Sequence, residues 1–75
     1  MTLDQLALGE DARIVELEGR GPFRRRLMEF GLLPGTRIQR TGQAPLGDPL
    51  SFRARGAVFS LRKGDAAAVR IEHAR

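Results

Sequence analysis

The segment that decides the fold of this chain spans residues 22–38 and reads PFRRRLMEFGLLPGTRI. Phe23, Leu27 and Phe30 recur in it at i, i+4 and i+7, a spacing that places them on one face of a helix. The segment therefore predicts a helix over 22–30. Its apolar stripe is expected to pack against the rest of the domain, with the basic residues mostly on the other side.

Glycine and proline mark where this helix begins and ends. Pro22 suits the first helical turn, because its missing N–H would have no helical partner there. Gly31 stands where a helix C-cap needs positive φ. Pro34 and Gly35 fit the central positions of a type II turn, which leads the chain into a strand over 36–41.

Alternation of apolar and polar residues predicts the remaining strands. Leu50, Phe52 and Ala54 alternate with polar neighbours, and Arg55–Gly56 fits the tight turn of a hairpin. The strands are expected at 13–18, 36–41, 50–55, 57–62 and 69–71, with single helical turns at 2–5 and 63–66.

These elements predict a mostly β fold of about five short strands, with the helix inserted between the first two. A small SH3-like barrel is the leading architecture, because closure of a curved sheet removes exposed strand edges. A two-layer α+β sheet is the competing one. With only 75 residues, the chain is expected to form a single domain over 1–75.

The composition indicates in which compartment the protein is expected and what charge its partners are expected to carry. The chain has no Cys and no apolar run long enough to cross a bilayer, and its N-terminus does not resemble a secretory signal, so we expect a soluble cytoplasmic protein without membrane insertion. Thirteen Lys and Arg against nine Asp and Glu give a formal charge of +4, which favours acidic partners. A well-solvated basic surface is the plainer interpretation.

Nucleic acid is a disfavoured partner. The outward-facing arginines expected on the strands are Arg53, Arg55, Arg62 and Arg70, and together they predict a basic stripe. Single-strand binders usually add exposed aromatic side chains for stacking. The only aromatic residues here are four Phe, all at positions expected to be buried.

Catalytic and metal-binding patterns are weak. The sequence has one His and neither Cys nor Tyr, so no triad or acid–base pair is predicted and the chain is not expected to be an enzyme. No phosphate-binding or dinucleotide motif is present. No metal site is predicted. Glu29, Asp48 and His73 are the only candidates, for a weak divalent ion such as Fe²⁺ or a surrogate, and ordinary surface carboxylates are the simpler interpretation.

Two segments are predicted to meet a protein partner. Arg24, Arg25 and Arg26 form a basic cluster on the helix, in which Arg24 and Arg25 are the assigned partner-binding residues, although a solvated helix face explains the cluster as well. Leu46, Gly47 and Asp48 form the tip of a loop stiffened by flanking prolines, although a rigid turn needed only for folding is the alternative. The helix and the loop are expected to share one docking face.

Other residues are assigned a structural role. Some anchor the helix, some reverse the chain into the second strand, and two stiffen the loop. They are Leu27, Phe30, Gly31, Pro34, Gly35, Pro45 and Pro49.

Three segments resemble the signatures of FeoA-domain proteins. Arg26–Ile38 is similar to that family's helix and turn, and Ala44–Leu50 to its loop, which reads APLGDPL here. Leu61–Ala66 is similar to a third family segment. The resemblance covers nearly the whole chain in the right order, and Phe30, where Leu is commoner, is a conservative departure.

This resemblance implies an SH3-like barrel with a helical insertion. It also implies a cytoplasmic accessory protein of bacterial ferrous iron transport that acts on the membrane GTPase-permease FeoB and reaches the inner face of the membrane through it. An alternative is a metal-binding regulatory domain like the C-terminal SH3-like domain of DtxR-type repressors, although no DNA-binding helix-turn-helix accompanies it. Weak homo-oligomerisation stays open.

Overall fold

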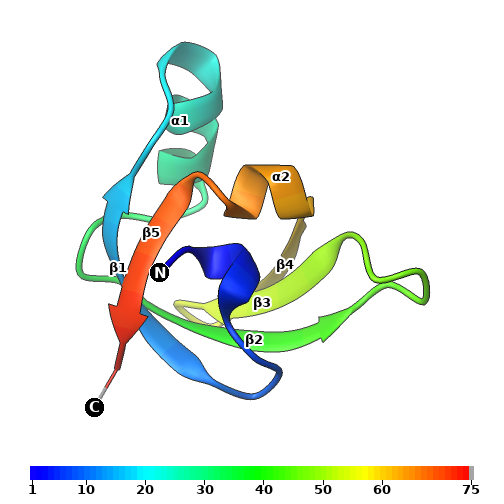
Figure 1. Cartoon of the computed structure of the whole chain (residues 1–75). Coiled ribbons are helices and arrows are strands. Elements are labelled where there is room, and N and C mark those ends of the chain that lie inside the picture. Colours follow the sequence, from blue (N-terminus) through cyan, green and yellow to red (C-terminus); the bar gives the residue numbers. More distant parts are fainter. Residues whose placement is uncertain (75) are drawn as a thin grey trace.

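The computed structural model describes residues 1–74, which form a strongly curved antiparallel sheet with a helix standing off it (Figure 1). The strands are β1 (Asp11–Leu17), β2 (Arg37–Gln43), β3 (Leu50–Ala54), β4 (Ala57–Leu61) and β5 (Val69–His73). The helices are the 3₁₀ turn η1 (Leu3–Gln5), α1 (Gly21–Glu29) and the short α2 (Lys63–Ala66). The predicted five strands and the helix between the first two are confirmed.

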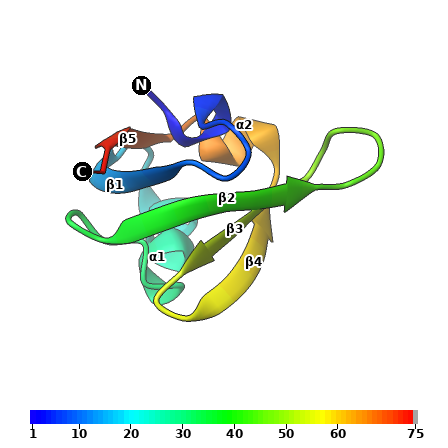
Figure 2. The same cartoon turned by 90° about the horizontal axis from the view of Figure 1, so that it is seen from below.

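The strands follow the order β4-β3-β2-β1-β5, so the chain's first and last strands are neighbours. Register shifts interrupt β1 between Ile14 and Glu16 and β2 between Arg40 and Gly42. Such bulges increase the local twist, and Figure 2 shows the strong curvature of the sheet. Within residues 1–74, β4 and β5 do not pair with each other, so the sheet has two edges.

The core fills the concave side of this sheet. Phe52, at the centre of β3, is its largest fully buried side chain. Around it pack apolar residues from every strand, from α1 and from both short helices: Leu3, Leu6, Ala12, Ile14, Leu17, Leu27, Leu32, Ile38, Leu50, Ala54, Leu61, Ala66, Val69 and Ile71. The alternation in β3 that predicted Leu50, Phe52 and Ala54 as core residues is confirmed.

Helix α1 contacts this core through few side chains. Leu27 is its only fully buried residue, and Phe23 is half-buried against the core. The helix ends in a Schellman motif, in which the Gly31 N–H donates to Met28 and the Leu32 N–H donates to Leu27. Gly31 has φ +87°, the left-handed conformation that glycine adopts without strain.

The predicted turn after α1 is present and is tied to β1. The Thr36 N–H donates to the Leu33 carbonyl at 3.0 Å, around Pro34 and Gly35, and Gly35 has φ +90°. This is the type II geometry expected from the Pro-Gly pair. Since the Gly35 N–H also donates to Ile14 at 2.7 Å, the turn fixes where α1 stands relative to the sheet.

The prediction that all four Phe are buried is wrong. Phe52 is buried, Phe23 and Phe59 are half-buried, and Phe30 is 53% exposed. Phe30 caps the C-terminal end of α1, where the helix has left the centre of the core. Its ring stacks instead on Phe59 of β4, with centroids 6.1 Å apart and the planes 8° from parallel.

The helices among residues 1–74 are too short or too polar to cross a bilayer.

Candidate docking site

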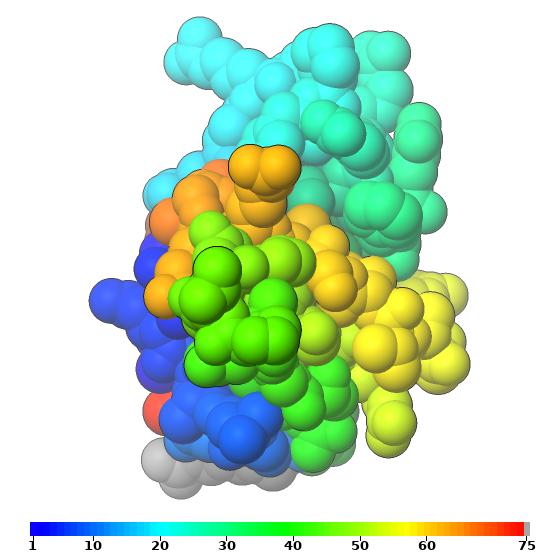
Figure 3. Space-filling model, turned by 90° about the vertical axis from the view of Figure 1, so that its right-hand side faces the viewer, coloured from blue at the N-terminus to red at the C-terminus, as the bar shows by residue number. Residues whose placement is uncertain are grey.

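Among residues 1–74, the large apolar side chain with the highest exposure lies in the loop between β2 and β3. Leu46 is 98% exposed at its tip. The Gly47 N–H donates to Ala44 at 2.8 Å, and the Ala44 N–H donates to Pro49 at 2.9 Å. These two bonds stabilise the loop beneath Leu46. In Figure 3 the loop (green) faces the viewer at the surface of the molecule.

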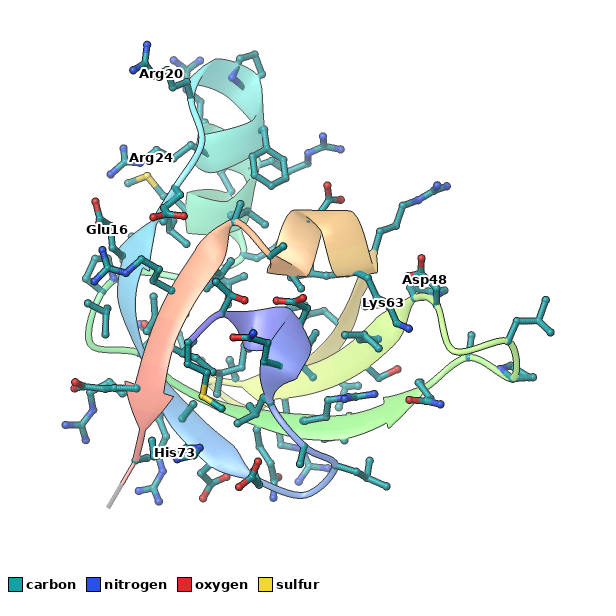
Figure 4. All side chains as sticks on the ribbon, in the orientation of Figure 1. Glu16, Arg20, Arg24, Asp48, Lys63 and His73 are labelled. Atoms are coloured by element: carbon teal, nitrogen blue, oxygen red, sulfur yellow. The ribbon has the colours of Figure 1, made fainter. Side chains whose placement is uncertain are left out.

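Asp48 has a structural partner that the sequence did not reveal. Its Oδ1 accepts a hydrogen bond of 3.0 Å from the backbone N–H of Lys63, the first residue of α2 (Figure 4). A carboxylate at this position satisfies one of the N–H groups that a helix leaves unpaired at its start. Asp48 therefore belongs to the fold as well as to the loop.

Replacing Asp48 with Ala is expected to lower the free energy of unfolding by about 1 kcal/mol, because the Lys63 N–H loses its acceptor. For a domain of this size that corresponds to a fall in Tm of roughly 4–8 °C, measurable by calorimetry. Asp48→Asn keeps an acceptor oxygen and is the matched control. Equal melting temperatures for Asp48→Ala and wild type would contradict the capping role.

Helix α1 presents its basic residues on two sides. Arg24 and Arg25 line a shallow cleft together with Met28, Glu29 and Leu33. Figure 4 shows Arg24 directed away from the β2–β3 loop. The cleft combines two guanidinium groups with exposed thioether and leucine surface, and one carboxylate partly offsets its charge.

A second groove lies on the other side of α1, between the helix and the end of β4. Its α1 wall consists of Phe23, Arg26, Leu27 and Phe30. The opposite wall consists of Pro49, Ser60, Leu61, Arg62 and Asp65, and the groove has a volume of about 320 Å³. Only its Pro49 belongs to the predicted loop.

The structure therefore does not bring the predicted partner-binding residues onto one face. Arg24 and Arg25 lie on one side of α1, whereas the base of the loop meets the helix on the other. Arg26, the third residue of the predicted basic cluster, lines the groove instead, together with Arg62. The spacing of Phe23 and Phe30 predicts a core-facing stripe, whereas in the structure this helix face lines the groove.

The three metal candidates lie far apart. Glu29 is on α1, Asp48 caps α2, and His73 is near the end of β5, at the opposite end of the molecule (Figure 4). His73 Nε2 lies 3.9 Å from a carboxylate oxygen of Glu10. Among residues 1–74, no group of three or more His, Cys, Asp and Glu side chains is arranged to hold a metal ion. These residues do not fit a resident divalent ion.

The outward arginines do not form one stripe either. Arg53 and Arg55 line a cleft with Arg37, whereas Arg62 stands at the groove beside α1. Arg70 forms an ion pair of 2.8 Å with Glu16 on the neighbouring strand. The alternation correctly placed all four on the surface, but the sheet curvature separates them.

Comparison with known proteins gives a consistent result. The family model described as "FeoA domain" matches residues 1–73. Over 72 residues, 96% of this chain, the sequence is 43% identical to a protein of Porphyromonas gingivalis named as a fusion of Fe(2+) transport protein A and the Fe(2+) transporter FeoB. The chain spans only 8% of that relative's length.

Two solved structures share the fold. Iron(II) transport protein A from Clostridium thermocellum is 36% identical, with a TM-score of 0.92 over 97% of this chain and 45% of that one. FeoA from Stenotrophomonas maltophilia, solved with zinc and described as a prokaryotic SH3 domain protein, is 28% identical. Its TM-score is 0.85, over 96% of this chain and 89% of that one. The SH3-like expectation is confirmed, and the chain belongs to the FeoA family.

Proposed function

We propose that this protein is a non-enzymatic accessory of ferrous iron transport that docks on a FeoB-type GTPase-permease. The observation that carries the proposal is the fusion protein of Porphyromonas gingivalis, in which a domain 43% identical to this chain is joined to the transporter itself. A covalent link keeps two domains at high local concentration. Where such a domain is not fused to the permease, it needs a binding surface to achieve the same proximity.

The loop tip is the surface we assign to this contact. Leu46 is almost fully exposed, and the hydrogen-bonded loop beneath it limits the entropy lost when a partner binds. Burial of one leucine side chain contributes about 1.5–3 kcal/mol. Arg24 and Arg25 form a second, basic contact on α1, which faces a different side and needs a partner that reaches around the domain.

The expected location and chemistry follow from this role. The protein acts at the cytoplasmic face of the membrane and is held there by the permease. In this role iron is the cargo of the permease, as the name of the Porphyromonas gingivalis relative states. Among residues 1–74 the His and carboxylate side chains do not converge on an ion site. The dispersed carboxylates and the single His also support a role without catalysis.

Replacing Leu46 with Ala is expected to weaken binding to the detergent-solubilised permease by about tenfold or more, because the lost apolar contact is worth at least 1.4 kcal/mol. Its Tm is expected to match wild type, since the side chain contacts solvent in the free protein. Pull-down and surface plasmon resonance measure the first, and calorimetry the second.

Leu8→Ala is the matched control, because Leu8 is a second exposed leucine, 67% accessible, outside the loop. It is expected to leave affinity and Tm unchanged. The docking assignment fails if Leu46→Ala binds as tightly as wild type, or if both leucine variants lose affinity equally.

A further inference from the structure

Strand β4 has a free edge, to which the proposed function assigns no role. The sheet ends at β4 on one side and at β5 on the other. The β5 edge is covered, because the Ile71 N–H donates to Met1 at 2.9 Å and Thr2 forms a bridge with Arg70. No backbone segment within residues 1–74 pairs with the outer side of β4.

Strand β4 also lacks the devices that usually protect an edge. Proteins block such edges with lysine, proline, a bulge or a covering segment. The sequence of β4 is AVFSL, without charge or proline, and its register with β3 is regular over all five pairs. Val58 is 62% exposed on it. An uncharged, regular and open edge is a template for a further strand.

The β3–β4 register identifies which backbone N–H and C=O groups of β4 are free to pair with an added strand. Ala54 and Ala57 close a two-residue turn and are therefore a hydrogen-bonded pair. Such pairs alternate along an antiparallel ladder, so Phe59 and Leu61 also bond to β3. The backbone N–H and C=O groups of Val58 and Ser60 consequently point away from the sheet.

The groove beside α1 lies where a strand added to this edge would place its side chains. Ser60 and Leu61 of β4 form part of one wall, and Phe23 and Phe30 of α1 form the other. Phe30 stacked on Phe59 provides an exposed aromatic floor next to it. A strand edge bordered by a helix is an arrangement that binds extended peptides by strand addition.

Charge selects the kind of peptide. Arg26 and Arg62 line the groove, with Asp65 as the single carboxylate in its lining. No carboxylate among the described residues forms a salt bridge with either arginine. The segment 20–30, which includes α1, carries four Arg against one Glu, a formal charge of +3. These charges favour an acidic ligand.

We infer that the edge of β4 and the adjoining face of α1 form a second docking site, which binds an extended acidic peptide segment of a partner protein that also carries apolar side chains. The peptide backbone pairs with Val58 and Ser60. Its side chains on the α1 side enter the groove, where apolar ones contact Phe23 and Phe30 and carboxylates meet Arg26 and Arg62. This site is separate from Leu46 and does not depend on which protein supplies the segment.

A second copy of this chain fits the edge less well. In a two-fold pairing, Val58 of one copy bonds to Ser60 of the other, which sets Arg62 opposite Gly56 and next to Arg55. Two basic α1 helices then also approach one another. Like charges at both positions oppose this dimer, whereas an acidic peptide relieves the same repulsion.

The test begins with a library of random heptapeptides displayed on phage and selected against the immobilised full chain. The most enriched sequence is synthesised, and its affinity is measured by fluorescence anisotropy. We expect enriched peptides to combine Asp or Glu with apolar residues. Selection without any consensus, or a consensus of basic peptides, overturns the inference.

Three variants locate the bound peptide. Arg62→Glu is expected to weaken binding by about tenfold, by reversing a charge at the groove. Ser60→Pro removes an outward N–H that β3 does not use, and is expected to weaken binding similarly while leaving the ladder intact. Arg53→Glu, an equal charge reversal elsewhere on the surface, is the control. Equal affinity in all variants overturns the site.

Amide hydrogen exchange of the wild-type complex gives an independent readout. The amide protons of Val58 and Ser60 should exchange quickly in the free protein and become protected when the peptide binds. Their continued rapid exchange in a saturated complex excludes strand addition, even where Ser60→Pro proves unstable. Concentration-dependent dimerisation that Ser60→Pro abolishes would instead assign the edge to a second copy and overturn the inference.

Discussion

Phe52→Ala is expected to lower the free energy of unfolding by about 3–5 kcal/mol, the usual cost of removing a fully buried phenylalanine. Phe52 is 0% exposed and lies at the centre of the core, where β3 meets the partly buried Phe59. A domain of this length has a total stability of roughly 4–11 kcal/mol. The variant should therefore unfold at a much lower urea concentration than wild type, and at the low end of that range it is unfolded at 37 °C, as judged by circular dichroism and urea titration.

Phe30→Ala is the matched control, because it makes the same chemical change at an exposed ring. It should cost about 1 kcal/mol, mainly the stacking on Phe59. Similar losses for the two variants would show that the ring of Phe30 is as deeply buried in solution as that of Phe52, contrary to the structure.

Leu27→Ala is expected to detach α1 while the sheet stays folded. Leu27 is the helix's only fully buried side chain, and a helix of nine residues is not stable in water by itself. Loss of about 3 kcal/mol at this contact should speed amide exchange in α1 roughly a hundredfold. Exchange in β2 and β3 should change far less, because those amides open mainly by global unfolding.

Met28→Ala, at the neighbouring exposed position, should leave exchange in α1 close to wild type. Hydrogen exchange followed by NMR separates the two regions residue by residue. Should α1 and the sheet lose protection together in Leu27→Ala, the helix would be part of the same cooperative unit as the sheet.

The elements that could be predicted from the sequence are those fixed by local chemistry. Gly31 and the Pro34–Gly35 pair act within a few residues, so the end of α1 and the turn after it follow from backbone preferences. The two-residue turn at Arg55–Gly56 is equally local, with φ of 54° and 80°. The alternation in β3 reflects one face against the core and needs no knowledge of the strand order.

The features that were missed depend on how distant segments meet. Asp48 caps a helix that begins 15 residues later, and no periodicity encodes that contact. The apolar stripe of α1 gave its inward direction, but the rotation of the helix over the sheet decided that Arg26 faces the groove while Arg24 and Arg25 do not. Phe30 lies on the apolar face of α1 as its spacing predicts, but at the end of the helix, outside the core.

In the docking surfaces too, local sequence predicts some features, and contacts between distant segments decide the others. The sequence predicts Leu46 and Asp48 as one contact surface, but in the structure Leu46 is exposed at the loop tip and Asp48 caps α2. The open edge of β4 could not be predicted, because it results from the strand order of the whole sheet. Local patterns identify strands but do not say which of them remains unpaired.

The pairing of β1 with β5 also bears on how the chain folds during synthesis. Ala12 pairs with His73, so this ladder joins residues about sixty positions apart, whereas the β3–β4 hairpin closes around two residues. Hairpins form locally and fast, but the long-range ladder must wait for its second strand. On the ribosome, β1 therefore emerges early and stays half-paired until β5 has left the exit tunnel. The native core is completed only then, and the intervening period is when the nascent chain most needs protection from aggregation.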